Sequence, residues 1–193
     1  GLGFMMSPIW QSIYFQGSTF VVRIVLGAES VAIFNTVRTV CRSVNQMFNT
    51  INGTILPELQ YEYGCGNMLI VRKLLRMSLL LSMIIGLIGA IILMLFGMEL
   101  YEWWTCSVLA VPNSVWLVFM AGILFNAIWW TSGVVYTTAN RPYFYAIVAT
   151  STAVLSVIMS FLLANYIGLL GAAIGAVSFD VVMMLVVLPN ACN

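Results

Sequence analysis

The chain has 193 residues, of which 62% are hydrophobic and 7% are charged, and its mean hydropathy is +1.05. Soluble domains are about 45–50% apolar and about 25% charged, so this composition excludes an ordinary soluble protein and predicts a polytopic membrane protein. With 7 basic and 6 acidic residues there is no basic surface for nucleic acid, and the lack of histidine removes the commonest general base and metal ligand.

Apolar runs of about 20 residues, the length that crosses a bilayer as a helix, follow one another along the chain. They predict spans at about 4–22, 30–56, 74–96, 113–137, 142–165 and 168–188. Pro57 and Gly97 mark the ends of the second and third spans, Pro142 opens the fifth, and Pro189 stops the sixth. The runs are too continuous for the alternating strands of a β-barrel, so we expect an all-α transmembrane bundle.

We expect residues 1–193 to form a single six-helix lobe, and the start at Gly1 indicates a fragment of a longer protein. Gly171 and Gly175, like Gly86 and Ala90, are four residues apart, which predicts close helix contacts. The 4 cysteines show no CxxC spacing, so neither a metal site nor a disulfide framework is expected.

The charged residues near the span ends predict the topology. With six spans, one side of the membrane carries four basic residues, namely Arg72, Lys73, Arg76 and Arg141. The other side carries Arg23 together with Glu29, Glu99 and Glu102. The positive-inside rule then places both ends in the cytoplasm. Residues 61–76 are predicted to form a short amphipathic cytoplasmic segment whose basic side chains meet anionic lipid headgroups.

The second span carries polar residues at spacings of 3, 4, 3, 4 and 3, which places them on one helical face. They are Asn35, Arg38, Arg42, Asn45, Asn49 and Asn52. If the span begins at Ser30, Arg38 lies about 12 Å deep and Arg42 about 18 Å deep, near the bilayer midplane. An arginine facing lipid there costs about 2.5–3.5 kcal/mol, so it needs a wet cavity or a partner.

Three interpretations of this stripe are open: a hydrated central cavity, an internal ion pair with Asp180 in the sixth span, or a helix on the membrane surface. Asp180 cannot satisfy both arginines, so the cavity is favoured. The first span adds polar residues at helical spacing, among them Gln11, and the fourth has a polar and aromatic second half around Asn126. An interfacial belt is the favoured interpretation of Trp129 and Trp130. The third and fifth spans lack such a stripe and are expected to face lipid.

Catalysis is not expected. Lys73 is the single lysine, and no serine or cysteine has a base beside it in the sequence. Glu99 and Glu102 suggest an acidic site of a membrane glycosyltransferase, but an aromatic belt with exposed acids, formed with Tyr101, Trp103 and Trp104, is favoured. We therefore expect no enzyme activity, no cofactor and no metal.

The cavity chemistry favours an anionic head group that carries hydroxyls. Arginine binds phosphate in bidentate fashion, and aromatic faces and amides bind sugar rings, so a lipid pyrophosphate linked to a sugar chain fits. The expected substrate-binding residues are Arg38, Arg42, Asn35, Asn45, Asn49, Asn52, Gln11 and Asn126. Asp180 is the candidate coupling-ion site, because it is the acid deep in a span.

The stretch Leu26–Gly64 resembles the bacterial O-antigen and polysaccharide flippases of the multidrug/oligosaccharidyl-lipid/polysaccharide exporter superfamily. The similar motifs are Arg38-Thr39 with Arg42, then Leu56-Pro57-Glu58, then Tyr63-Gly64. The ending Gly168–Met184 is similar to the last helix of that family. The resemblance implies a MATE-like transporter with twelve spans in two lobes, of which this chain is the C-terminal lobe.

The resemblance further implies that the protein moves a lipid-linked oligosaccharide across the bacterial inner membrane by alternating access, for O-antigen and lipopolysaccharide biosynthesis. Its implied partners are that lipid pyrophosphate, membrane lipids, and either an N-terminal lobe or a second copy. Two alternatives are a cation-coupled exporter of drugs or metabolites that uses Asp180, and a non-transporting scaffold for polysaccharide assembly.

Overall fold

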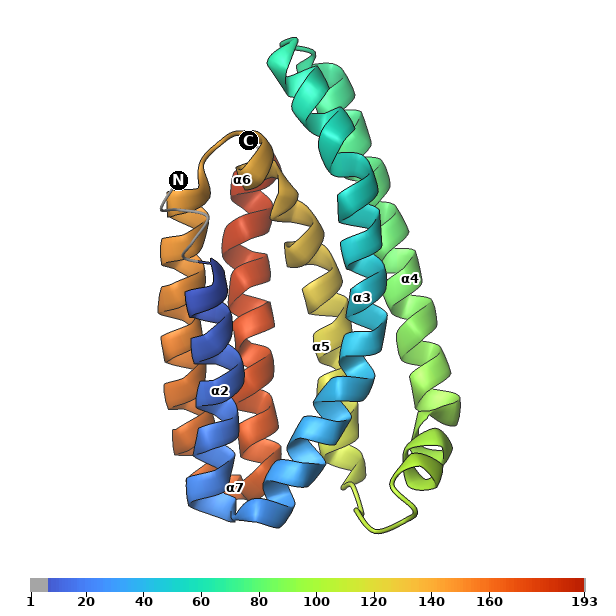
Figure 1. Ribbon diagram of the computed structural model, residues 1–193, viewed down its shortest axis with the longest axis vertical. Helices are drawn as coiled ribbons and strands as arrows, with labels where there is room; N and C mark the ends of the chain where they lie inside the picture. The colour runs from blue at the N-terminus through green and yellow to red at the C-terminus, as the bar shows by residue number, and fades with distance from the viewer. Residues whose placement is uncertain (1–6, 193) are drawn as a thin grey trace.

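The structure is a computed structural model that describes residues 7–192 as a bundle of long helices (Figure 1). In chain order the helices are α2 (Ser7–Leu26), α3 (Ala28–Gly64), α4 (Met68–Trp104), α5 (Asn113–Ser132), α6 (Val134–Thr138) and α7 (Pro142–Cys192). No strand occurs within residues 7–192, which confirms the all-α prediction. The predicted start of the first span near Phe4 lies outside the described residues.

Helix α7 consists of two antiparallel halves. Ile167 and Gly168 leave the helical conformation, and Gly168 has φ 62° and ψ −140°, a combination open essentially to glycine. The chain reverses there, since the Ser160 hydroxyl donates to the carbonyl oxygen of Ala172 at 3.2 Å. Figure 1 shows the two halves side by side, in orange and red. The reversal falls between the predicted fifth and sixth spans.

Small residues bring the two halves of α7 into backbone contact. A Cβ atom added to Gly171 would overlap the backbone of Leu163, and one added to Gly175 would overlap the backbone of Ser160. Gly86 is likewise buried on α4 and lies against side chains of α3 and α5. The predicted close contacts at these glycines are confirmed.

Three helical segments are long and apolar enough to cross a membrane, namely Met68–Trp104, Asn113–Thr138 and Pro142–Pro189. The most apolar of them, α4, buries few of its residues and exposes Leu80, Ile84, Leu87 and Ile91. Such an apolar surface suits a helix in contact with lipid, because the transfer of apolar side chains from water to lipid is favourable. Helices α2 and α3 are absent from this group within the described part of the chain, so the prediction of six spans is not confirmed; the polar stripe of α3 lowers its hydropathy.

Helix α3 is longer than the predicted span 30–56. Pro57 was expected to end it, but the helix continues to Gly64, so that prediction is wrong. A proline inside a helix removes one hydrogen bond, here the bond to the carbonyl of Gly53. Leu59, two residues later, is 1% exposed, so tertiary packing holds the helix beyond the proline.

Helix α4 likewise exceeds the predicted span 74–96, and Gly97 does not end it. Gly97 is buried where a larger residue would press on the indole of Trp116, so glycine serves packing there. Pro189 also lies inside α7 and does not stop it, whereas α7 does begin at Pro142 as predicted. Residues 61–76, predicted as a separate amphipathic segment, instead form the tip of a hairpin between α3 and α4.

The start of α2 and the end of α7 lie at the same end of the bundle (Figure 1). The tip of the α3–α4 hairpin projects beyond the other helices at that end. It carries Arg72, Lys73 and Arg76, all exposed. The α2–α3 and α4–α5 connections lie at the opposite end. Glu29, in the first turn of α3, and Glu102, in the last turn of α4, are next to these connections. The helix arrangement therefore separates the two sets of charges as the topology prediction requires.

Candidate substrate-binding cavity

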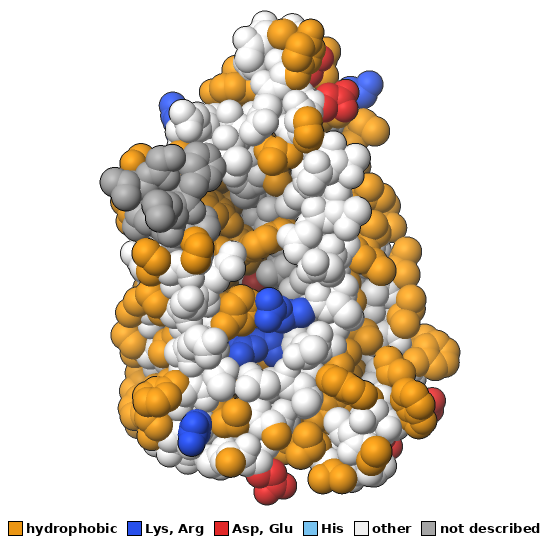
Figure 2. Space-filling model, in the orientation of Figure 1, with side chains coloured by type: hydrophobic (Ala, Val, Ile, Leu, Met, Phe, Trp, Pro, Cys, Tyr) orange, Lys and Arg blue, Asp and Glu red, His pale blue; other side chains and the backbone are white. Residues whose placement is uncertain are grey.

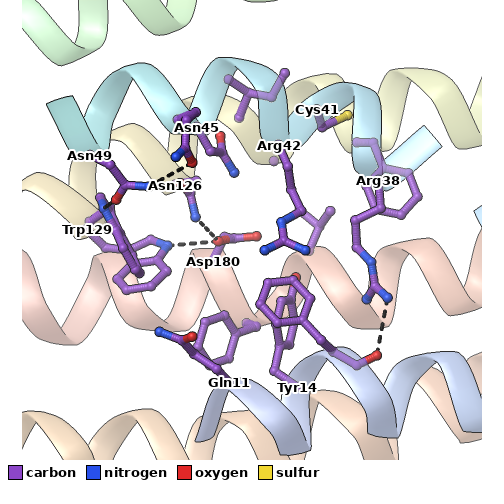
Figure 3. Close-up of a pocket in the computed structure, with 18 of the residues that line it drawn as sticks. Gln11, Tyr14, Arg38, Cys41, Arg42, Asn45, Asn49, Asn126, Trp129 and Asp180 are labelled. Atoms are coloured by element: carbon purple, nitrogen blue, oxygen red, sulfur yellow. Dashed lines mark hydrogen bonds between the residues drawn. The ribbon is translucent and has the colours of Figure 1, made fainter. Parts of the chain in front are cut away.

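A cavity of about 230 Å³ lies among α2, α3, α5 and the second half of α7. Figure 2 shows a hollow in the middle of one face of the molecule, with basic side chains (blue) beside it. The polar residues that line the cavity are Gln11, Tyr14, Arg38, Arg42, Asn45, Gln46, Asn49, Asn126 and Asp180. These side chains come from four separate stretches of sequence, and several are labelled in Figure 3.

Two predicted site residues, Asn35 and Asn52, do not line the cavity. The Asn35 Oδ1 accepts hydrogen bonds from Arg38 at 2.9 Å and from Thr19 at 3.0 Å. The Asn52 Nδ2 donates to the carbonyl oxygen of Trp130 at 3.2 Å. Both side chains therefore join helices, and the other predicted residues form the cavity wall.

Arg38 lies at the edge of the cavity but is 8% exposed and fully engaged with its neighbours. Its guanidinium donates to Ser18 Oγ at 2.7 Å, to Thr19 Oγ1 at 2.8 Å and to the Phe15 carbonyl oxygen at 3.2 Å. With the bond to Asn35, these contacts tie α3 to α2. Arg38 therefore acts mainly as a link between two helices.

Arg42, one turn further along α3, is exposed to the cavity. Its guanidinium lies over the ring of Phe15, 4.4 Å from the centroid, and makes no hydrogen bond with the described residues. The same ring also lies 5.2 Å from the guanidinium carbon of Arg38. A cation over an aromatic face gains about 0.5–2 kcal/mol, and this contact leaves the five N–H donors of Arg42 free.

Asp180 is 7% exposed and holds one carboxylate oxygen in a fixed position. That oxygen, Oδ1, accepts from Asn126 Nδ2 at 2.9 Å and from the Trp129 indole N–H at 2.8 Å. Figure 3 shows the second oxygen pointing away from these donors, toward the side of the cavity where Arg42 lies. Within residues 7–189 neither arginine forms an ion pair with Asp180, so the alternative interpretation of an internal ion pair does not hold there.

Aromatic side chains make up much of the remaining wall. Trp129 is 1% exposed, so the interpretation of this residue as part of an interfacial belt is wrong. Trp10, 3% exposed, stacks on Phe179 with ring centroids 5.4 Å apart and meets Trp129 edge-on at 6.0 Å. Sequence reasoning missed Trp10, Phe15 and Phe179. Trp10 lies four residues before Tyr14, a spacing that places both on the cavity face of α2.

The predicted aromatic belt at the end of α4 is partly confirmed. Trp103 and Trp104 are 80% and 53% exposed, and Glu99 and Glu102 are exposed as well. Tyr101, in contrast, is 1% exposed, and its hydroxyl lies 2.8 Å from the hydroxyl of Thr36 on α3. Tyr101 therefore packs between helices and is not part of the belt.

The described residues contain no group of three or more His, Cys, Asp or Glu side chains that could hold a metal ion. Comparisons with family models, with curated proteins and with solved structures found no match to this chain.

Proposed function

We propose that this chain is the C-terminal lobe of a flippase that moves a lipid-linked oligosaccharide across the bacterial inner membrane for polysaccharide and O-antigen biosynthesis. The observation that carries the proposal is the position of the Arg42 guanidinium in the cavity. A guanidinium without hydrogen-bond partners among the described residues lies in a polar and aromatic cavity of a strongly apolar helical bundle. Arginines inside membrane segments mark substrate pathways, because their burial is otherwise too costly.

The proposal takes α2, α3, α4, α5 with α6, and each half of α7 as membrane crossings. Helix α2 has 20 residues and is about 30 Å long at 1.5 Å per residue, which matches the hydrocarbon core of a bilayer. The position of the start of α2 and the end of α7 at one end of the bundle agrees with an even number of crossings. The basic side chains of the hairpin tip support placing that end in the cytoplasm.

In the bound state, Arg42 would hold the phosphate group, since its planar guanidinium matches two phosphate oxygens. The amides of Gln11, Asn45 and Asn49 offer donors and acceptors to sugar hydroxyls, and Trp130 offers a face for a sugar ring. The cavity of about 230 Å³ is smaller than the roughly 300–1,000 Å³ of sites for drug-sized ligands, so it holds a head group and not a whole glycan. An N-terminal lobe or a second copy would supply the rest of the wall for alternating access.

The test is the substitution Arg42→Ala in a strain that lacks its own flippase. We expect surface polysaccharide to disappear while the protein still inserts into the membrane, and Arg42→Lys to restore only part of it because the bidentate geometry is lost. Arg141→Ala, which removes an exposed cation outside the cavity, is the matched control and should leave polysaccharide normal. Normal surface polysaccharide with Arg42→Ala would refute the proposal.

A cation-coupled exporter is the second candidate, and the observation that favours it is the buried carboxylate of Asp180 with one oxygen turned to the cavity. On that account Asp180→Asn eliminates gradient-driven export of a cationic dye, and unchanged export removes this candidate. A non-transporting scaffold, in turn, is excluded if the full-length protein alone moves a lipid-linked oligosaccharide across liposome membranes.

A further inference from the structure

The cavity contains two groups of opposite charge that do not neutralise each other. Arg42 enters it from α3, and Asp180 enters it from the second half of α7 (Figure 3). No ion pair joins them in the part of the chain that the structure describes. Arg42 lies over the ring of Phe15, and among the described residues Asp180 accepts hydrogen bonds only from the neutral groups of Asn126 and Trp129.

Each of these charges is left with unused bonding capacity. A carboxylate inside an apolar bundle is costly unless a cation or several donors compensate it, and here both donors bind the same oxygen, Oδ1. The second oxygen, Oδ2, accepts no hydrogen bond from the described residues. One carboxylate oxygen and one guanidinium therefore remain for a ligand to satisfy.

We propose that the head group bound in this cavity is zwitterionic, with a phosphate held by Arg42 and an ammonium group held by Asp180. The free amine of an amino sugar linked to phosphate has this chemistry. The inference rests on the proposed function and specifies the substrate class of the same site.

Other head groups fit the cavity less well. A ligand with only anionic groups brings like charge to Asp180, which is unfavourable in surroundings of low dielectric constant. A neutral sugar hydroxyl donates one hydrogen bond to the carboxylate but leaves its charge uncompensated. An ammonium group supplies the missing positive charge and donates a hydrogen bond to the free oxygen of Asp180.

Three soluble probes test the inference: glucosamine 1-phosphate, N-acetylglucosamine 1-phosphate and glucose 1-phosphate. Their binding to the full-length protein in lipid nanodiscs is measured by titration calorimetry. We expect glucosamine 1-phosphate to bind roughly 10-fold more tightly than the other two probes. It alone carries an ammonium group, which can donate a charged hydrogen bond to the Asp180 carboxylate. Asp180→Asn should remove this preference, because glucosamine 1-phosphate then binds more weakly while the other two probes bind as tightly as before or more tightly, since the like charge near their phosphate is gone.

The variants keep the shape of the site. Asparagine at position 180 retains an oxygen that can accept from Asn126 and Trp129, and circular dichroism checks that the helices remain. Glu99→Gln, the same chemical change at an exposed acid outside the cavity, should preserve the 10-fold preference. Arg42→Gln should weaken all three probes to a similar extent, since all carry the phosphate.

Equal binding of the three probes, no binding of any probe, or a preference that survives Asp180→Asn would each overturn the zwitterionic assignment. Equal binding would leave the proposed flippase intact. The flippase proposal fails by a different result, namely normal surface polysaccharide with Arg42→Ala.

Discussion

Arg38 and Arg42 lie one turn apart on the same face of α3 and both contact Phe15, yet their hydrogen bonding differs sharply. Arg38 is 8% exposed and donates hydrogen bonds to two hydroxyls of α2, to a backbone carbonyl and to Asn35. Arg42 is exposed to the cavity, where it lies over the ring of Phe15 and makes no hydrogen bond with the described residues. The comparison shows that helical spacing places a charged side chain, whereas the neighbouring helix decides whether that side chain stabilises the fold or remains free to bind a ligand.

The largest expected difference is in stability. Arg38→Ala leaves the acceptors of Ser18 and Thr19 without their donor, and we expect the free energy of unfolding to fall by about 2 kcal/mol. Arg42→Ala loses only a cation–π contact and should cost less than about 1 kcal/mol. Unfolding of both variants in detergent micelles measures the two values. Equal losses would show that the contrast between the two arginines is wrong.

A smaller effect is expected at the main acceptor for Arg38. Ser18 is fully buried and also donates from its hydroxyl to the carbonyl oxygen of Tyr14 at 2.6 Å, so Ser18→Ala should cost about 1 kcal/mol. In the double variant with Arg38→Ala and Ser18→Ala, the free energy of unfolding should fall by clearly less than the sum of the two single losses. Both substitutions remove the same contact. Strict additivity in this double-mutant cycle would contradict a shared network.

The smallest effect is expected at Phe15, which contacts both guanidiniums. Phe15→Leu keeps an apolar side chain there but removes the aromatic face, so it should lower the free energy of unfolding by about 0.5–1 kcal/mol. It should also weaken phosphate binding slightly, because the Arg42 guanidinium loses the surface that orients it. Binding of glucose 1-phosphate, measured beside unfolding, separates the two effects. A loss as large as that of Arg38→Ala would mean that Phe15, and not the Arg38 hydrogen bonds, holds α2 against α3.

The sequence alone was sufficient for the helical class and for the polar stripe, because a 3–4 spacing depends on one helix only. It could not separate Arg38 from Arg42, since the difference arises from Ser18 and Thr19 on another helix. It also could not place Trp129, because an indole near a span end is equally compatible with a membrane interface and with a buried carboxylate partner.

The helix ends were predicted poorly for a similar reason. Pro57 and Gly97 are local signals for termination, but both lie inside helices whose continuation depends on tertiary packing. Gly97 lies against Trp116 from α5, a contact that no local pattern reveals. In contrast, the reversal at Gly168 was predictable, since its backbone conformation requires glycine regardless of its neighbours.

The most direct measurement of the central claim is transbilayer movement of a lipid-linked oligosaccharide in liposomes that contain only the full-length protein. We expect the substrate to reach the opposite leaflet with the unaltered protein, Arg42→Ala to stop this movement, and Arg141→Ala to leave it unchanged. Movement at the normal rate with Arg42→Ala, or no movement with the unaltered protein, would contradict the account.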